Sequence, residues 1–443
     1  MGKNFEKKIR IGIIGFGTVG CGTAKILLEN RENILKKTGL DLELVKVADL
    51  DITTPREIEL PAGMLTDNTN EIIEDDSIDL GIELIGGTTA AKTIIEKLLK
   101  KGKGVVTANK ALLAKHGIEL FRLARENETF ISYEASCAGG IPIVLALRSG
   151  LAANNIEGIY GILNGTCNFI LTSMAVENKD FPVALKEAQE KGYAEADPTL
   201  DINGGDSGHK IAILASIAFG YEISFDDVRV SGIENISIQD INYGLEMGYV
   251  LKLLAVAQRD AGDGISLRVM PAFISKTDQL AGVSGPFNAV SVFGDAVGQT
   301  MYYGRGAGMM PTASAIIADV IEAGLGNAKR SFEAMKLRSR EEFLEHRADP
   351  DEIESRFYIR LLALDKPGVF SKLSEVLGKN GISISGALQH EGRGPNNTVP
   401  VIITTHLTKL SAINKSIEQI QSLSVIEGCP TCIQIAELPE DTD

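Results

Sequence analysis

Residues 9–20 read IRIGIIGFGTVG, a β-rich run that leads directly into three glycines. Gly15, Gly17 and Gly20 have the spacing G-x-G-x-x-G, and an amphipathic stretch, residues 18–37, follows. In this strand–turn–helix order, the first glycine permits a tight turn, the second lets the backbone approach a pyrophosphate and the third allows close helix–strand packing. The N–H groups at the start of the helix are then free to bind the anion. The stretch predicts a dinucleotide-binding site.

The next strand-like run, residues 42–49, ends in Asp49. A carboxylate at this position binds the ribose hydroxyls of the adenosine and repels a 2′-phosphate, so it favours NAD. Asp49 comes 29 residues after Gly20 (49 minus 20), later than usual, which predicts a long first helix or a long exit loop. Arg56 is close enough in sequence to assist a phosphate, so NADP stays open.

Strand-like and helix-like segments continue to alternate up to residue 136. Strands are expected within residues 78–89, 103–110 and 129–136, and helices within residues 90–102 and 117–128. This α/β alternation predicts a Rossmann-type, doubly wound parallel sheet. Ligands of such sheets bind beyond the carboxyl ends of the strands. Cofactor contacts are therefore expected from Gly86, Gly87, Thr88, Asn109 and Lys110, although an ordinary solvated side chain is the alternative for Lys110.

Composition excludes several classes of protein. The net charge of −15 argues against nucleic acid and anionic membranes as partners. No run of about 18 apolar residues occurs and the N-terminus does not read as a signal peptide, so a soluble cytoplasmic protein is expected. Five cysteines fit a reducing compartment. Cys429 and Cys432 form a CPTC pair without obvious metal-binding partners, and we interpret them as two unreactive thiols.

Charged residues gather at residues 192–210, GYAEADPTLDINGGDSGHK, directly before an apolar helix. Asp206 and Lys210 are four residues apart and therefore share one helical face. A surface ion pair is the alternative. Because residues 211–219 are apolar nearly all round, the pair must instead face a cavity or be paired internally. Glu195 and Asp201 lie in the neighbouring loop and can converge on it, whereas His209 faces a different side and receives no role.

This set of groups suits one kind of chemistry. A lysine beside a carboxylate can exchange a proton with a hydroxyl next to a hydride centre, and carboxylates can hold a substrate ammonium group. With a nicotinamide cofactor, the pocket predicts oxidation of an amino-alcohol, or the reverse reduction.

The chain divides into four expected segments. They are a dinucleotide-binding domain at residues 1–135 with about 305–325, an α+β substrate-binding, catalytic and dimerisation domain at 136–304, a charged linker or solvated helix at 326–355, and a domain at 356–437. The last segment has a strand–helix–strand–strand–helix–strand pattern, which predicts a ferredoxin-like layer.

Several motifs, taken in order, resemble the homoserine dehydrogenase family over roughly residues 9–325. They are GFGTVG (15–20), TANK (107–110), YEASCAGGIPI (133–143), ILNGTCNFI (162–170), the stretch at 192–210 and YGRGAGMMPTASAIIAD (303–319). The resemblance implies reversible NAD(P)-dependent interconversion of L-homoserine and L-aspartate 4-semialdehyde, in threonine, methionine and isoleucine biosynthesis. Residues 356–437 resemble the ACT domain, a small regulatory fold.

The resemblance also implies roles for individual residues. Lys210 matches the proton donor, Glu195 and Asp206 match homoserine-binding carboxylates, and Lys110 matches a lysine at the nicotinamide and substrate. Matches to further cofactor contacts are Phe16, Thr18, Val19, Gly192 and Gly306. Matches to a monovalent cation site, usually sodium, are Glu134 and the carbonyls of Cys137, Gly139 and Ile141. Cys137 replaces a more usual aliphatic residue, which a carbonyl ligand tolerates.

For the C-terminal segment the resemblance implies either binding of an effector, expected to be L-threonine, or dimerisation alone. Its turn regions match at Asp365, Pro367, Gly368, Asn380, Gly381 and Ile382. A homodimer or homotetramer is expected, and no aspartokinase-like segment precedes the dehydrogenase part. Two alternatives stay open: another dehydrogenase of the saccharopine or sugar type, and a non-catalytic sensor that binds cofactor and amino acid.

Overall fold

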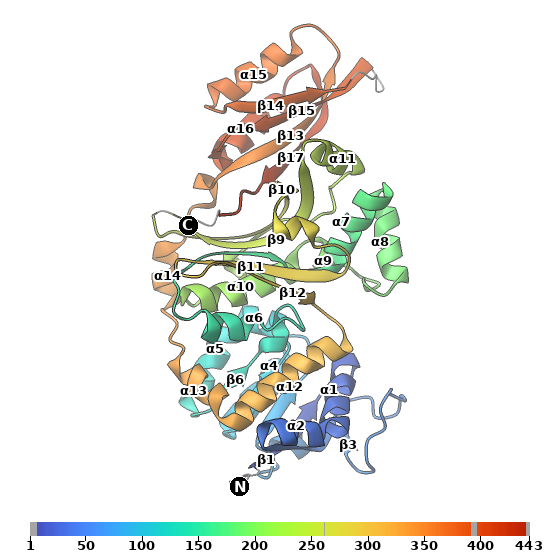
Figure 1. Ribbon diagram of the computed structural model, residues 1–443, viewed down its shortest axis with the longest axis vertical. Coiled ribbons are helices and arrows are strands. Elements are labelled where there is room, and N and C mark those ends of the chain that lie inside the picture. The colour runs from blue at the N-terminus through green and yellow to red at the C-terminus, as the bar shows by residue number, and fades with distance from the viewer. Residues whose placement is uncertain (1–6, 261, 391–396, 440–443) are drawn as a thin grey trace.

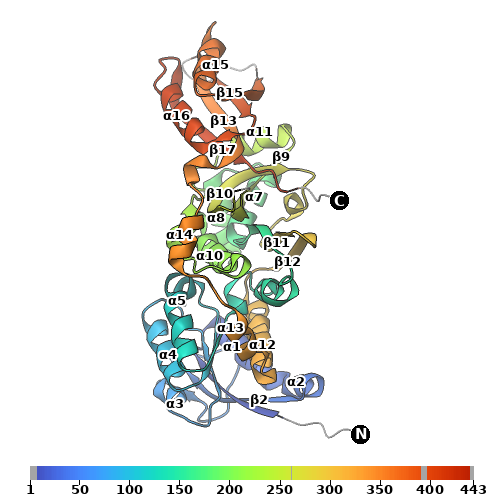
Figure 2. The ribbon, with the colours of Figure 1, turned by 90° about the vertical axis from the view of Figure 1, so that its left-hand side faces the viewer.

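The computed structural model describes residues 7–260, 262–390 and 397–439. The molecule is elongated. A parallel sheet with its helices lies at the N-terminal end, a sheet with two helices lies at the other end, and a mixed layer lies between them (Figures 1 and 2). Among the described residues, no single helix is long and apolar enough to cross a membrane. One consecutive pair, residues 309–325 and 327–334, passes by length and composition but is bent by 89°.

The N-terminal sheet has the strand order β3-β2-β1-β4-β5-β6, and all neighbouring strands are parallel. The strands are β1 (Lys7–Ile14), β2 (Leu40–Ala48), β3 (Leu65–Thr66), β4 (Leu80–Glu83), β5 (Gly104–Thr107) and β6 (Ile131–Ser132). This is the order of a doubly wound dinucleotide-binding sheet, so the predicted fold class is confirmed.

Five helices connect these strands: α1 (Thr18–Glu29), α2 (Arg31–Thr38), α3 (Asn70–Ile73), α4 (Ala90–Lys100) and α5 (Lys110–Glu126). The amphipathic stretch at residues 18–37 is two helices, because the chain breaks at Asn30. The second of them ends at Gly39, whose φ of 73° suits a glycine. This additional helix fills the long interval between Gly20 and Asp49.

Lys110 begins a helix and does not end a strand. The strand expected at residues 103–110 stops at Thr107. Asn109 then caps α5, because its side-chain oxygen accepts a hydrogen bond from the Leu112 N–H at 3.1 Å. Lys110 still lies beyond the carboxyl end of β5, where the sheet is expected to bind its ligand.

A later helix, α12 (Met309–Leu325), returns to the N-terminal sheet and packs on α1. The contact is close, because a Cβ added to Gly22 would lie 2.7 Å from the Cγ of Met309. Ala313, Ile316 and Val320 share one hydrophobic core with Ile11 of β1. Two segments far apart in sequence therefore form one body.

The middle layer is an antiparallel sheet in the order β12-β11-β7-β9-β10. Its strands are β7 (Ile156–Ile162), β9 (Tyr249–Arg259), β10 (Ile265–Ser275), β11 (Phe287–Gly294) and β12 (Gly298–Arg305), and β8 (Arg229–Val230) pairs with β10. The helices are α6 (Ile143–Leu145), α7 (Gly165–Glu177), α8 (Phe181–Glu190), α9 (Thr199–Ile202), α10 (Gly205–Phe219) and α11 (Ile238–Glu246). Most of the apolar residues of α10 are buried, as its sequence predicts, and Ile217 and Ala218 are partly buried.

Residues 326–355 pack more firmly than the solvated linker that their charge predicts. They form α13 (Asn327–Ala334), α14 (Arg340–His346) and a short 3₁₀ turn (Pro350–Glu352). Phe332 packs edge-on to Phe121, and Phe343 is fully buried near Tyr221. Two aromatic side chains thus anchor a stretch in which half of the other residues are charged.

The C-terminal domain consists of β13 (Glu354–Leu364), α15 (Val369–Lys379), β14 (Ile384–Gln389), β15 (Thr398–Thr405), α16 (Leu410–Gln421) and β17 (Ile426–Ile435), with a short β16 (Thr408–Lys409). The predicted ferredoxin-like topology is confirmed, with the strand order β17-β13-β15-β14. β17 also pairs in parallel with β10, so the middle and C-terminal sheets are continuous. Cys429 and Cys432 are both exposed on β17. No group of three or more His, Cys, Asp or Glu side chains suited to a metal occurs in the described part of the chain.

Candidate active site

The glycine turn between β1 and α1 has the geometry that its sequence predicts. Gly15 has a φ of 107°, and a Cβ there would lie 2.6 Å from the carbonyl carbon of Leu84. A Cβ on Gly20 would lie 2.1 Å from the carbonyl oxygen of Gly15. Gly17, by contrast, has open space where its Cβ would be. The turn is therefore tight where it packs and free where a pyrophosphate would approach the start of α1 at Thr18.

The carboxylate of Asp49 and the guanidinium of Arg56 both contact the glycine turn beyond the end of β2. The Phe16 N–H donates to Asp49 Oδ2 at 2.5 Å, which ties this carboxylate to the glycine turn. Arg56 Nε donates to the carbonyl of Phe16 at 3.1 Å, and Arg56 Nη2 lies 3.3 Å from Asp51 Oδ2. Both groups thus lie where the adenosine ribose of a dinucleotide binds such a sheet.

The loops after β4 and β5 meet at the same edge of the sheet. Asn109 Nδ2 donates to the carbonyl of Gly87 at 2.7 Å, which joins the two loops. Gly86 and Gly87 both have positive φ, 73° and 70°, and Thr88 is half-buried beside them. Glu83 is fully buried below, where it accepts from Thr107 Oγ1 at 2.7 Å and from the Ile85 N–H at 2.9 Å. Its burial raises its pKa.

Asp206 is the centre of a buried charge cluster in the first turn of α10. It is 4% exposed, and two lysines contact it. Lys210 Nζ donates to Oδ2 at 2.6 Å, and Lys110 Nζ lies 3.0 Å from Oδ1. Burial alone would raise the pKa of Asp206, but the charges of Lys210 and Lys110 outweigh it and hold the pKa well below its usual value. The charge of Asp206 in turn raises the pKa of Lys110. The predicted pair at residues 206 and 210 is therefore internal, and Lys110 joins it from the other domain.

Asn164 holds the neighbouring carboxylates in place. Its Nδ2 donates to Asp206 Oδ2 at 2.9 Å and to Asp201 Oδ1 at 2.7 Å, and its Oδ1 caps α7 by accepting from the Cys167 N–H at 2.8 Å. Burial raises the pKa of Asp201, and the charge of Asp206 adds to this effect. Asp201 and Asp206 are thus brought together as the sequence predicts, by a residue that the sequence analysis missed.

A cavity of about 630 Å³ opens on this cluster from between the two domains. Its lining includes residues from the starts of α1 and α5, from the segment between β6 and α6, from the loop before α9, from α9 and α10 and from the segment before α12: Val19, Lys110, Gly139, Gly192, Glu195, Asp201, Asp206, Lys210 and Gly306. Glu195 is exposed at the rim, outside the buried cluster of carboxylates. The cavity is large enough for a small substrate beside a nicotinamide.

Asn288 contributes an unpaired acceptor to the wall of this cavity. Its Nδ2 donates to the carbonyl of Leu163 at 2.8 Å, and the same carbonyl accepts from Lys210 Nζ at 2.7 Å. Its Oδ1 is buried and has no hydrogen-bond partner among the described residues. A Cβ on Gly306 would lie 2.1 Å from Asn288 Cγ, so only glycine fits there. A buried acceptor without a partner is costly, which indicates that a ligand donor completes this site.

The expected cation-binding segment lies against the same cavity. Glu134 is buried, and its carboxylate accepts from the N–H groups of Val144 at 2.9 Å and Leu145 at 2.7 Å. Burial raises the pKa of Glu134 to about 7. Gly139 packs so closely on Gly306 that a Cβ would lie 2.4 Å from its carbonyl oxygen. Of the expected carbonyl ligands, that of Ile141 already accepts from the Ile143 N–H at 2.8 Å.

Comparison with known proteins identifies this arrangement. Models of the homoserine dehydrogenase catalytic domain, its NAD-binding domain and the ACT domain match residues 142–321, 15–134 and 357–422. The chain is 41% identical to a homoserine dehydrogenase of Neisseria gonorrhoeae over 435 residues, which covers 98% of this chain and 99% of the relative. The chain belongs to the homoserine dehydrogenase family. It is an NAD(P)-dependent oxidoreductase that acts on a CH–OH group.

Solved homoserine dehydrogenases share the fold over all or most of the chain. The enzyme from Thiobacillus denitrificans superposes with a TM-score of 0.87 at 38% identity, covering 97% of this chain and 99% of that one. A hyperthermophilic archaeal homoserine dehydrogenase in complex with NADPH superposes with a TM-score of 0.59 at 27% identity and covers 72% of this chain and 98% of that one. The first comparison includes the C-terminal domain, so the predicted ACT domain of this family member is confirmed.

The open face of Gly17, the free N–H groups of α1 and the carboxylate beside Phe16 fit the dinucleotide of a homoserine dehydrogenase. Asn164, Asn288 and Glu83 are three polar residues of the site to which the sequence analysis assigned no role. For Asn164 there was a signal, because it stands between an apolar strand and an apolar helix, at a cap position. Asn288 and Glu83 lie inside strands or at their ends and look ordinary in sequence.

Proposed function

We propose that the chain interconverts L-homoserine and L-aspartate 4-semialdehyde at the cluster of Lys210, Asp206 and Lys110, as a step of threonine, methionine and isoleucine biosynthesis. One observation carries the proposal. A buried carboxylate holds two lysines at the wall of a cavity that also reaches the dinucleotide turn. The carboxylates and lysines of this cluster fit an amino-alcohol, which has an ammonium group and a hydroxyl, better than they fit a substrate of the saccharopine or sugar type.

Lys210 is assigned the proton transfer. An ammonium group has three N–H donors, and two of them bind Asp206 Oδ2 and the Leu163 carbonyl. The third is left for the substrate oxygen. A nicotinamide cofactor bound in this cavity would supply the hydride chemistry, as acceptor of a hydride from the hydroxyl-bearing carbon or as its donor to the aldehyde carbon. In the direction of reduction, Lys210 donates its proton to the aldehyde oxygen, and in the direction of oxidation it recovers that proton.

The carboxylates are assigned different tasks. Asp206 already accepts from two lysines and one amide, so its main effect is to position them and to keep their charge. Glu195 and Asp201 keep more of their capacity to accept hydrogen bonds and are assigned the substrate ammonium group. Asp206 stabilises the charged form of Lys110. Lys110 comes from the dinucleotide-binding domain, and we assign it contacts with both the nicotinamide and the substrate. Thr88, Gly192 and Gly306 complete the cofactor contacts.

The ACT domain is assigned a regulatory role with L-threonine as the effector. Its turns have the positive φ that such turns need, 87° at Gly368 and 75° at Gly381. β14 is the edge of the sheet, and within the described residues its other side pairs with no strand. A second copy can add to this edge, which supports a homodimer or a homotetramer.

One assay tests the activity, the coenzyme and the effector together. We expect L-homoserine to be oxidised in the presence of NAD⁺ or NADP⁺, with the lower KM for NAD⁺ because Asp49 repels a 2′-phosphate. The absorbance of the reduced nicotinamide follows the rate. L-Threonine should lower that rate. Binding of both coenzymes without turnover would favour the sensor alternative. A rate and a thermal stability that do not respond to threonine would contradict only the regulatory role.

A monovalent cation, expected to be sodium, is assigned to Glu134 and the carbonyls of Cys137, Gly139 and Ile141. Among the described residues, the hydrogen-bond donors to the buried carboxylate of Glu134 are the backbone N–H groups of Val144 and Leu145, which leaves it able to accept a cation. We expect exchange of sodium for tetramethylammonium to lower the rate, and Glu134→Gln to lower it roughly tenfold or more. Because the pKa of Glu134 is about 7, the sodium concentration for half-maximal rate should fall as the pH rises through that value.

Cys137→Val is the matched control for this prediction. It changes a side chain and keeps the backbone carbonyl, so the response to sodium should persist. An equal response to sodium in the wild type and in Glu134→Gln would contradict the site.

A further inference from the structure

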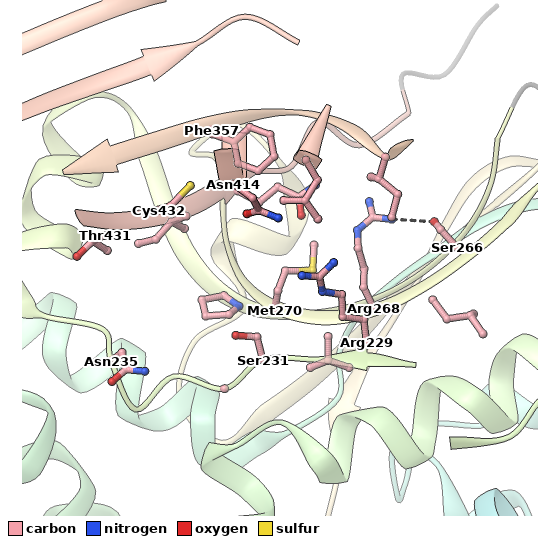
Figure 3. A pocket seen from close by; sticks show the side chains of 18 of the residues that line it. Arg229, Ser231, Asn235, Ser266, Arg268, Met270, Phe357, Asn414, Thr431 and Cys432 are labelled. Atoms are coloured by element: carbon pink, nitrogen blue, oxygen red, sulfur yellow. Dashed lines mark hydrogen bonds between the residues drawn. The ribbon is translucent and has the colours of Figure 1, made fainter. Parts of the chain in front are cut away.

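A second large cavity, of about 640 Å³, lies far from the charge cluster, between the middle domain and the ACT domain. Its floor comes from β8 and β10, and its opposite wall comes from β13, α16 and β17. Figure 3 shows the side chains of Arg229 and Arg268 rising from the floor, with Phe357, Asn414 and Cys432 on the other side. Neither the dinucleotide turn nor the Asp206 cluster contributes to it.

The lining of this cavity carries an excess of positive charge. Arg268 Nη1 donates to Ser266 Oγ at 2.8 Å and Nη2 donates to Gln258 Oε1 at 3.2 Å. Its Nε is buried and has no hydrogen-bond partner among the described residues. In the described part of the chain, the partners of this guanidinium are thus neutral, and no carboxylate there forms an ion pair with it.

Two further arginines line the same cavity, and each has only a distant carboxylate partner among the described residues. Arg229 lies 3.9 Å from Asp351, and both of these side chains are more than half exposed. Arg347 lies 3.8 Å from Asp227, but that carboxylate already binds Arg340 through both oxygens, at 2.6 and 3.0 Å. Three arginines and one aspartate therefore line the cavity of a chain whose net charge is −15.

We propose that this cavity binds a small dianion, a phosphate monoester or a dicarboxylate. The lining has a surplus of two positive charges (three arginines against one aspartate), which two negative charges on the ligand match. Guanidinium groups bind both kinds of anion through paired, charge-assisted hydrogen bonds. Hydroxyl and amide groups at Ser231, Asn235, Asn414 and Thr431 supply further donors. The proposal does not rest on threonine regulation, which concerns the ACT turns and a zwitterion.

Occupation of the cavity would strengthen the contact between the two domains. Arg360 of β13 bridges them already, because it donates to Thr431 Oγ1 at 3.0 Å and, through Nε, to Asp240 Oδ1 of α11 at 2.6 Å. Thr431 lines the cavity as well. A ligand held between β10 and β17 binds the folded pair of domains only, so it must raise the unfolding temperature.

Two probes test the proposal: glycerol 3-phosphate for a phosphate monoester and succinate for a dicarboxylate. The full chain is used, with NAD⁺ at saturation so that the dinucleotide site does not respond, and sodium chloride keeps the ionic strength constant. We expect one probe to bind with a stoichiometry of one per chain in calorimetry and to raise the unfolding temperature. Arg268→Gln should weaken its binding about tenfold or more, the loss expected for a charge-assisted hydrogen bond.

Three further variants serve as controls. Arg268→Lys keeps the charge and should weaken binding less than Arg268→Gln. Arg330→Gln makes the same change of net charge on exposed α13, away from the cavity, and should leave binding unchanged. Arg229→Gln, at the exposed rim, replaces Arg268→Gln if that variant does not fold. No binding of either probe, or equal binding in wild type and Arg268→Gln, would overturn the proposal. Loss of threonine binding in Arg268→Gln would overturn the selectivity for a dianion.

Discussion

The Lys210→Ala variant is expected to keep its fold and its affinity for NAD⁺ but to lose most of its turnover, with kcat reduced by roughly 10²- to 10⁴-fold. Lys210 is the more deeply buried of the two lysines in the cluster and still has one N–H donor for the substrate oxygen, since Asp206 and the Leu163 carbonyl take the other two. Steady-state kinetics with L-homoserine, together with titration of NAD⁺, measure the effect.

Lys252→Ala is the matched control for this variant. Lys252 is 3% exposed, donates to Asn168 and to the carbonyl of Val283, and does not line the active-site cavity. Both variants remove a buried lysine and leave acceptors without their donor, so both should lower stability. Only Lys210→Ala should lower kcat. A kcat near that of the wild type in Lys210→Ala would remove Lys210 from the proton transfer, whatever the stability of the variant.

The parts of the site that sequence predicts are those with local geometry. The glycine turn depends on residues 15–20 and on the helix that follows, and its spacing states the backbone shape directly. Asp206 and Lys210 share a helix face because they are four residues apart, and the apolar α10 shows that this face is internal. The order of strands and helices likewise predicts the parallel sheet. A helix between two strands carries the chain back along the sheet, so that the next strand runs parallel to the one before.

Contacts between residues far apart in the chain could not be predicted from the sequence. Asn288 meets the carbonyl of Leu163 across 125 residues, and Asn164 meets Asp206 across 42. The residues next to an asparagine in the sequence do not show whether its side chain has a buried partner or is exposed to solvent. The arginine-lined cavity is a stronger case, because its walls come from two domains, where β10 of one pairs with β17 of the other although the two strands are far apart in sequence. Charge content alone also misled for residues 326–355, where Phe332 and Phe343 decide the packing.

The Asp206→Asn variant is expected to lose both activity and stability, because one carboxylate supports two lysines. The wild-type contacts are 2.6 Å to Lys210 and 3.0 Å to Lys110. An amide in the same place leaves two neighbouring cations without a counter-charge. Removal of one partner from a buried pair costs about 3–5 kcal/mol, and we expect a loss of this order in the free energy of unfolding near neutral pH. The kcat should fall by roughly 10²-fold, because Lys210 and Lys110 are no longer held in place.

The pH dependence has a definite sign. The pKa of Asp206 is lowered in the fold, so its contribution to stability is present above the usual pKa of an aspartate, about 4, and is lost as the pH falls through the lower folded value. The pKa of Lys110 is raised, so its contribution is fully present below the usual lysine value of about 10 and is lost as the pH rises through the higher folded value. The difference in stability between wild type and Asp206→Asn should therefore be largest between these limits and shrink outside them. Denaturant unfolding over this pH range measures it.

Asp227→Asn separates stability from catalysis. Asp227 has a fully buried side chain that pairs with Arg340 at 2.6 Å, and it lies outside the active-site cavity. This substitution makes the same chemical change in a second buried ion pair, so it should lower the unfolding free energy while kcat stays near the wild-type value. An Asp206→Asn variant that matched Asp227→Asn in both measurements would show that Asp206 acts on the fold alone. A larger loss of kcat at a similar loss of stability is the result that places Asp206 in the chemistry, through the two lysines that it orients.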